Sequence, residues 1–97
     1  MIKEIEFKEN AELLFENFKL FLIEKNRRYG NSALAPVQIF SKNTPEDQIL
    51  NRLDDKLSRI KNRGDTELKK NDVSDVFGYV ALLMIKKQWT SFDELLD

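Results

Sequence analysis

The stretch that decides the fold is TPEDQILNRLDDKLSRI, residues 44–60. Thr44 is a good helix cap, Pro45 suits the first helical position, and the two acids that follow face the positive end of a helix dipole. Leucine and isoleucine then recur at a 3-4-3 spacing, which places them on one side of a helix. These residues are Leu50, Leu53, Leu57 and Ile60. The pattern predicts a helix over residues 45–63 that Gly64 ends.

The segment before this stretch also has helical spacing. From about Asn10 its apolar residues recur three or four positions apart, as far as a basic cluster. These residues are Ala11, Leu14, Phe15, Phe18, Phe21 and Leu22. The spacing predicts a helix over residues 10–29. Gly30 is placed to end this helix, because glycine accepts the left-handed backbone of a helix end.

The segment after the stretch predicts a third main helix, over residues 72–88. Asn71 is the candidate cap, and Asp72 lies in the first turn, where an acid is stabilised by the helix dipole. The side expected to be buried consists of Val73, Val76, Phe77, Val80, Leu83 and Met84. Two lysines at the far end suit the negative pole of the dipole.

The remaining segments are short. Residues 1–9 alternate weakly, which predicts an extended lead-in or a short strand, and residues 91–96 (SFDELL) predict a short capped helix. The loop over residues 31–43 has apolar residues that we expect to pack onto the helices. They are Leu34, Val37, Ile39 and Phe40. The expected fold is one all-α domain over residues 1–97, a small bundle of three main helices and a short C-terminal one.

Composition excludes several function classes. The chain has 97 residues, with 16 Lys and Arg against 17 Asp and Glu, and it lacks both Cys and His. A protein that coats duplex nucleic acid usually has a large basic excess, so we expect no duplex partner and only local phosphate binding. A metal would need oxygen ligands, which indicates Mg²⁺ or Mn²⁺. The start is too charged for a signal peptide and no apolar run is long enough to cross a bilayer, so we expect no membrane partner and a cytoplasmic location.

Two acidic pairs occupy comparable places on the second and third expected helices. Asp54 and Asp55 lie in RLDDKLSRI, and Asp72 and Asp75 lie in NDVSDVFGY together with Tyr79. Residues three or four apart share one side of a helix. If the two helices pack side by side, their carboxylates can converge and hold a hard cation that bridges to substrate phosphates.

An ordinary structural role also explains these acids. Asp55 is flanked at helical spacing by Arg52 and Arg59, which predicts ion pairing on a solvated face. Asp72 and Asp75 lie near the start of a helix, where acids are favoured in any case. Spacing alone favours this ordinary role over a metal site.

The stretch EKNRRYGNSALAP, residues 24–36, combines a basic cluster with a nearly neutral loop. Lys25, Arg27 and Arg28 are candidate phosphate ligands, because guanidinium groups bind phosphate oxygens in a bidentate fork. Tyr29 is a candidate for stacking on a base. The alternative is a basic helix end that the dipole favours, with Gly30 as its stop.

The run from EKNRRYGNSAL through RLDDKLSRI to NDVSDVFGYVALLM resembles a phage family, the nucleotide modification associated domain of the first type. That family is related to the MazG-like all-α nucleotide pyrophosphatases, and the resemblance covers about residues 13–87. MazG-like enzymes carry Glu-Glu-x-x-Glu and Glu-x-x-Asp, which bind the Mg²⁺ that holds a nucleoside triphosphate. Residues 54–58 (DDKLS) and 72–75 (DVSD) stand in those places, but each Glu is shortened to Asp or lost, and Ser58 replaces the last acid.

The resemblance implies roles for named residues. The implied metal ligands are Asp54, Asp55, Asp72 and Asp75. The implied ligand-binding residues are Lys25, Arg28, Tyr29, Asn31, Ser32, Lys56, Arg59 and Tyr79. Lys25 and Arg28 would meet phosphates, and Tyr29, Asn31 and Ser32 would contact base or sugar. Since Asp retracts each oxygen and Mg²⁺ tolerates little deviation from octahedral geometry, hydrolysis is expected to suffer more than binding.

Three functions follow, in order of preference. The first is a phage nucleotide-binding protein that captures a phosphate-bearing nucleotide, linear or cyclic, with weak or no hydrolysis, and serves nucleotide modification or counter-defence. The second is a Mg²⁺-dependent nucleoside triphosphate pyrophosphatase. The third is a non-nucleotide interaction module. The resemblance also implies a homo-oligomer, a dimer or tetramer, and the aromatic surplus of the first helix agrees: Phe15, Phe18 and Phe21.

Overall fold

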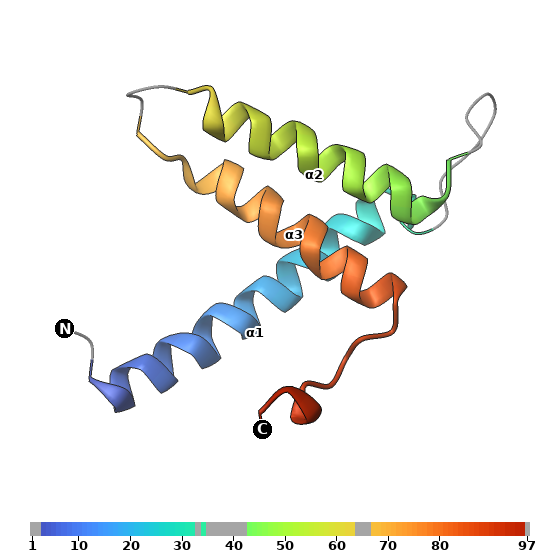
Figure 1. Cartoon of the computed structure of the whole chain (residues 1–97). Helices are drawn as coiled ribbons and strands as arrows, with labels where there is room; N and C mark the ends of the chain where they lie inside the picture. Colours follow the sequence, from blue (N-terminus) through green and yellow to red (C-terminus); the bar gives the residue numbers. More distant parts are fainter. Residues whose placement is uncertain (1–2, 33, 35–42, 64–66, 97) are drawn as a thin grey trace. The chain divides into compact units, whose positions relative to one another are not determined.

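The computed structural model describes residues 3–32, 34, 43–63 and 67–96. Its elements are α1 (Glu4–Arg28), α2 (Pro45–Lys61), α3 (Lys70–Lys86) and the 3-10 helix η1 (Asp93–Leu95) (Figure 1). The all-α fold class is confirmed, with no strand among these residues. The chain divides into two compact units, Met1–Ser32 and Ala33–Asp97, and each is described by itself. The prediction that they form one bundle stays a prediction.

α1 begins earlier than the sequence pattern indicated. The helix runs from Glu4, so the extended lead-in predicted for residues 1–9 is wrong from Glu4 onward. Glu4 and Glu6 lie in the first turn, where the helix dipole stabilises negative charge. This local preference for a helix outweighs the weak alternation of the segment. An isolated β-strand is also unstable unless a second strand pairs with it.

The C-terminal end of α1 confirms the role predicted for Gly30. Its φ angle is 60°, in the left-handed region that favours glycine. The N–H of Gly30 donates to the carbonyl of Arg27 at 3.2 Å, and the N–H of Asn31 donates to the carbonyl of Asn26 at 3.0 Å. This pair of bonds is the Schellman motif, which satisfies carbonyls that a helix end would otherwise leave without donors.

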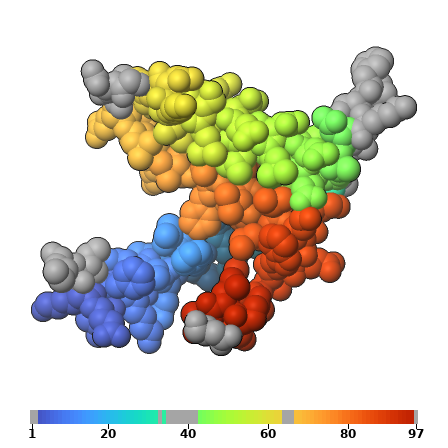
Figure 2. All heavy atoms as spheres, viewed as in Figure 1, coloured from blue at the N-terminus to red at the C-terminus, as the bar shows by residue number. Residues whose placement is uncertain are grey.

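The second unit contains a helical hairpin of α2 and α3 (Figure 1). Glu46 at the start of α2 pairs with Lys87 just after α3, with 2.8 Å between Oε1 and Nζ. Arg63, just after α2, pairs with Asp72 at the start of α3. The two pairs fix an antiparallel arrangement, and Figure 2 shows side chains of α2 (green to yellow) against those of α3 (orange). We refer to α2 and α3 together as the hairpin.

The start of α2 forms as predicted, but its buried side is rotated. The N–H of Asp47 donates to Thr44 Oγ1 at 3.1 Å, which confirms Thr44 as the cap. Leu50 and Leu57 are 39% and 46% exposed, so the predicted side is wrong at both positions. The residues that are buried or half-buried at a 4-3-4-3 spacing are Ile49, Leu53, Lys56, Ile60 and Arg63. Polar side chains occupy two places in this stripe, so a pattern of apolar residues alone missed its direction.

α3 differs from its prediction in a similar way. It begins at Lys70 with Lys69 in the capping position, so Asn71 is not the cap. Val73 and Val80 are 44% and 40% exposed, whereas Asp72 is buried. The ion pairs of Asp72 turn its side of the helix toward α2, which moves the two valines off the buried side. The other residues predicted to be buried are half-buried: Val76, Phe77, Leu83 and Met84.

The end of α3 repeats the turn found at the end of α1. Gln88 has a φ angle of 61°, and its N–H donates to the carbonyl of Ile85 at 3.0 Å. The N–H of Trp89 donates to the carbonyl of Met84 at 2.9 Å. The short helix predicted over residues 91–96 is a single 3-10 turn that no side chain caps. Three residues cannot form a regular α-helical turn with i to i+4 bonds.

Some predictions fall outside the described residues. They concern Gly64 and the loop residues Val37, Ile39 and Phe40. Leu34 is described and is half-buried. None of the helices in the described part of the chain combines the length and apolar composition that a bilayer crossing requires.

Candidate functional site

Four charged side chains meet between α2 and α3, and we call them the hairpin cluster: Lys56, Arg63, Asp72 and Asp75. Lys56 Nζ lies 2.9 Å from Asp75 Oδ2 and 3.5 Å from Asp72 Oδ1. Arg63 Nη2 donates to Asp72 Oδ2. Asp72 therefore binds cations from two positions on the α2 side, and Lys56 bridges both carboxylates.

Electrostatics favour the charged form of Lys56. The four side chains of the hairpin cluster are between 10% and 19% exposed, so water screens them less than surface pairs. The hydrogen bond to Asp75 raises the pKa of Lys56, and Asp72 adds to the effect. Two cations balance two carboxylates, which is the condition under which charges are tolerated away from solvent.

The predicted metal ligands do not all come together. Asp72 and Asp75 face α2, but Asp54 and Asp55 are exposed. No ion pair joins Asp54 or Asp55 to another described residue, so the pairing predicted between Asp55 and the neighbouring arginines is not observed either. Within the described residues no group of three or more acidic side chains is placed to hold a metal ion. A Mg²⁺ site stays a prediction.

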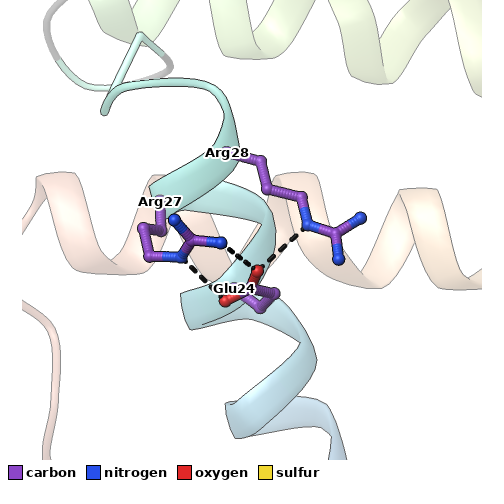
Figure 3. Close-up of polar contacts among 3 residues, drawn as sticks. All are labelled: Glu24, Arg27 and Arg28. Carbon is purple, nitrogen blue, oxygen red and sulfur yellow. Dashed lines mark hydrogen bonds and ion pairs between the residues drawn. The ribbon is translucent and has the colours of Figure 1, made fainter.

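The other candidate region is the basic end of α1, which we define as Glu24, Lys25, Arg27, Arg28 and Tyr29. Glu24 accepts from both arginines (Figure 3). Arg27 Nε lies 3.0 Å from Glu24 Oε2, and Arg27 Nη2 lies 2.6 Å from Oε1. Arg28 Nε lies 3.0 Å from the same Oε1. One carboxylate thus orients two guanidinium groups.

The two arginines differ in how many of their nitrogens bind Glu24. Arg27 commits Nε and one terminal nitrogen to Glu24, whereas Arg28 commits Nε alone (Figure 3). Both terminal nitrogens of Arg28 therefore remain clear of Glu24. The hydrogen bond from Arg27, followed by that from Arg28, lowers the pKa of Glu24, and Glu24 in turn raises the pKa of Arg27.

The other side chains at the basic end of α1 and just after it are exposed to solvent, except that Lys25 lies over an aromatic ring. Tyr29 is 66% exposed, and Asn31 and Ser32 are exposed as well. Lys25 Nζ lies 5.2 Å from the centroid of the Phe21 ring, a cation–π distance. An exposed aromatic ring beside guanidinium and ammonium groups is a combination that suits a nucleotide, with phosphate on the cations and a base on the ring.

The predicted ligand-binding residues fall into two groups. Five belong to the unit of α1: Lys25, Arg28, Tyr29, Asn31 and Ser32. Three belong to the hairpin: Lys56, Arg59 and Tyr79. Within the hairpin, Lys56 joins the cluster, Tyr79 is half-buried and Arg59 is exposed.

Sequence reasoning missed two contacts of the candidate regions. Arg63 was not a candidate, although it continues the 4-3-4-3 stripe of α2 by one position and precedes an acid on the next helix. Glu24 is not among the predicted contacts either, although it stands three and four residues before Arg27 and Arg28. Charge pairs at that spacing on a helix are a readable signal.

Comparison with known proteins adds no family. No protein-family model, curated protein or solved structure matches this chain. The resemblance to the phage family therefore stays a prediction from the three sequence motifs.

Proposed function

We propose that this protein captures a phosphate-bearing nucleotide or a nucleotide-derived signal at the basic end of α1, and that it hydrolyses its ligand weakly or not at all. The nucleotide class comes from the resemblance to the phage family. A role in nucleotide modification or in sequestering a defence signal belongs to the same proposal. A homo-oligomer is part of the proposal as well.

The observation that favours capture over turnover is the neutral hairpin cluster. Lys56 and Arg63 already satisfy the carboxylates of Asp72 and Asp75. A Mg²⁺ ion at these carboxylates has to displace or approach an ammonium group, which costs Coulomb energy in a poorly hydrated place. This supports capture over metal-dependent turnover.

The basic end of α1 supports phosphate binding. Three cations stand against one carboxylate there, which leaves a local positive charge on a chain whose net charge is −1. Lys25 and Arg28 are three residues apart and share one side of the helix. The terminal nitrogens of Arg28 that are clear of Glu24 match two phosphate oxygens.

The arginine pair provides a matched experiment. We expect Arg28→Ala to weaken binding of a nucleoside triphosphate by roughly tenfold or more, the loss typical of one charge-assisted contact. Arg27→Ala should have a smaller effect, because Arg27 already spends two nitrogens on Glu24. Isothermal titration with a panel of triphosphates and cyclic di- and trinucleotides measures both.

Lys19→Ala is the control for the loss of a cation on the same helix. Lys19 is exposed and pairs with Glu16 at 3.0 Å, outside the basic end. Equal losses from Arg28→Ala and Lys19→Ala would reduce the effect to bulk charge and contradict a phosphate site at Arg28. Unchanged affinity in the Arg28 variant would contradict it as well.

An interaction module is the second candidate, and the exposure of α1 favours it. Eight large apolar residues of α1 are between 47% and 66% exposed, including Phe7, Leu14 and Phe21, whereas Phe18 and Leu22 are half-buried. Exposed apolar area of this kind is typical of interaction surfaces. A Mg²⁺-dependent pyrophosphatase has less support, and Asp72→Ala with Asp75→Ala should abolish any Mg²⁺-dependent turnover.

A further inference from the structure

Glu24 is an acid in the middle of a region that is proposed above to bind a negatively charged ligand. Its carboxylate lies between the two guanidinium groups of the basic end of α1 (Figure 3). Coulomb repulsion alone makes an acid unfavourable in such a place, because it repels the phosphate. The hydrogen bonds of Glu24 indicate a second effect of opposite sign, which comes from the way in which they hold Arg28.

The three side chains form a chain of contacts from Arg27 through Glu24 to Arg28. Arg27 holds the carboxylate with two nitrogens, Nε at 3.0 Å from Oε2 and Nη2 at 2.6 Å from Oε1. A two-point contact of this kind fixes the orientation of the carboxylate. Nε of Arg28 then donates to Glu24 Oε1 at 3.0 Å. Arg28 is therefore oriented by a carboxylate that is itself oriented.

We propose that Glu24 is a positioning residue for phosphate. It holds Nε of Arg28, so that the two terminal nitrogens point outward as a fork of donors for two oxygens of one phosphate group. The proposal rests on the phosphate site proposed above. Figure 3 shows both terminal nitrogens of Arg28 on the side of the guanidinium group away from Glu24. Such a fork binds phosphate with a more defined geometry than a single donor does.

Holding Arg28 in advance lowers the entropic cost of binding a ligand. The side chain of Arg28 is 71% exposed, so packing restricts its rotation little. Arginine is among the side chains with the most rotamer entropy, and fixing a free one on binding weakens affinity by about five- to tenfold. Because Nε is already bound to Glu24, much of that loss has occurred before the ligand arrives.

The repulsion between Glu24 and the phosphate is the smaller effect. A phosphate on the terminal nitrogens of Arg28 lies on the far side of the guanidinium group from Nε, which places it roughly 7 Å from the carboxylate. The side chain of Glu24 is 44% exposed, so water and ions surround it. With a Debye length of about 8 Å at physiological salt, the repulsion changes the affinity by only about twofold. The net effect of Glu24 is therefore to strengthen phosphate binding.

The place of Arg28 on the helix increases the need for this orientation. Arg28 is the last residue of α1, and the C-terminal end of a helix is the negative end of its dipole. That end repels a phosphate, unlike the N-terminal end, where backbone N–H groups bind anions directly. A phosphate at the end of α1 thus depends on cations that are aimed at it.

Glu24→Gln tests the proposal, because it removes the charge but keeps the size and the helix propensity of the side chain. In NMR without ligand, nitrogen relaxation of the Arg28 Nε–H group should show greater mobility in this variant than in the wild type. Glu16→Gln is the matched control, since Glu16 pairs with Lys19 at 3.0 Å, about 12 Å along the helix from Glu24. Equal mobility of Arg28 in all three proteins would overturn the proposal.

Binding is measured with inorganic tripolyphosphate, which carries phosphates without a base, by NMR titration of the Gly30 amide at constant ionic strength. Glu24→Gln should weaken binding about threefold or more, whereas Glu16→Gln should leave it unchanged or slightly tighter. Arg28→Lys keeps the charge and removes the fork. In that background Glu24→Gln should instead strengthen binding, by up to about twofold, because only the repulsion is left to remove. A role of Glu24 in helix stability alone predicts no such reversal.

The outcomes separate this proposal from the proposed function. Equal or tighter binding of tripolyphosphate by Glu24→Gln would overturn the positioning role. The same weakening in the Arg28→Lys background, or no binding by the wild type, would overturn it as well. The proposed function fails separately if the wild type binds tripolyphosphate but none of the nucleotides of the panel.

Discussion

Two cations bind the carboxylate of Asp72, one at each of its oxygens. Arg63 approaches Oδ2 and Lys56 approaches Oδ1, and the side chain is buried between α2 and α3. Breaking a poorly solvated pair by removing one partner leaves the other charge without compensation. Asp72 is therefore expected to matter for the stability of the hairpin as well as for any ligand.

We expect Asp72→Ala to lower the free energy of unfolding by about 2 kcal/mol, the cost typical of losing a charge-assisted hydrogen bond. Asp54→Ala is the control, because Asp54 is exposed and should cost within about 0.5 kcal/mol. Urea unfolding followed by circular dichroism measures both. Equal losses would mean that the hairpin cluster contributes no specific stability.

The raised pKa of Lys56 predicts that the free energy of unfolding depends on pH in the alkaline range. Because its pKa is raised in the folded state, its contribution is fully present below the ordinary lysine pKa of about 10.4 and is lost as the pH rises through the folded value. The difference in free energy of unfolding between the wild type and Lys56→Met should stay constant from neutral pH to about pH 10 and shrink above it.

The control for this pH series is Lys61→Met. Lys61 is exposed near the end of the same helix and forms no ion pair with a described residue. The difference in free energy of unfolding between the wild type and Lys61→Met should not shrink over the pH range in which the difference for Lys56→Met shrinks. If the difference in free energy of unfolding between the wild type and Lys56→Met stayed constant up to about one pH unit above the ordinary lysine pKa, it would contradict the account.

Lys56 and Arg63 also show where residue-level prediction stops. Both stand in the stripe of α2 that turns toward α3, where apolar spacing indicates only hydrophobic side chains. A cation is acceptable in such a stripe once the facing helix supplies carboxylates, and that depends on tertiary pairing. The sequence indicated Lys56 as a ligand contact and did not indicate that it neutralises Asp72 and Asp75.

At the scale of the element, two helix ends use the same turn with different residues. Gly30 and Gln88 both have φ angles near 60°, and both close a Schellman motif. A left-handed backbone costs a non-glycine residue about 1 kcal/mol or more. The end of α3 therefore keeps at Gln88 a strain that Gly30 avoids at the corresponding position of α1, where the next residue, Asn31, also has a φ angle of 62° but is of a type that tolerates it better.

We expect Gln88→Gly to raise the free energy of unfolding by roughly 1 kcal/mol through relief of that strain. Gly30→Ala is the matched reverse change, and it should destabilise the end of α1, although a Cβ at Gly30 meets no atom within 4 Å. Thermal unfolding of both variants tests the pair. A destabilised Gln88→Gly protein would show that the glutamine side chain contributes more than the backbone strain costs.

The sequence shows which segments form helices. It shows less well where each helix begins and which of its sides is buried. Thr44 and Pro45 marked the start of α2 correctly, because capping is a local interaction that four residues specify. The start of α1 was misplaced, since nothing in its sequence caps a helix at Lys3. The rotation of α2 by one position, with Ile49 buried in place of Leu50, is decided by what α3 presents.

At the scale of the whole molecule, charge is arranged by region. The net charge is −1, but the hairpin cluster is neutral, and α1 has most of its acids in its first half and most of its cations in its second half. The sequence indicated that the cations at the end of α1 lie close together, because their residues are contiguous. It did not determine whether Asp54 and Asp55 face Asp72 and Asp75, since that convergence depends on which side of α2 turns inward.

The most direct test of the central claim combines titration with product analysis. The purified wild type is titrated with nucleoside triphosphates and cyclic di- and trinucleotides, with and without Mg²⁺, and the nucleotide is then recovered and identified. The account predicts a ligand that binds and is recovered intact in both conditions. Conversion of a triphosphate to monophosphate and pyrophosphate only with Mg²⁺, or no binding of any nucleotide, would contradict it.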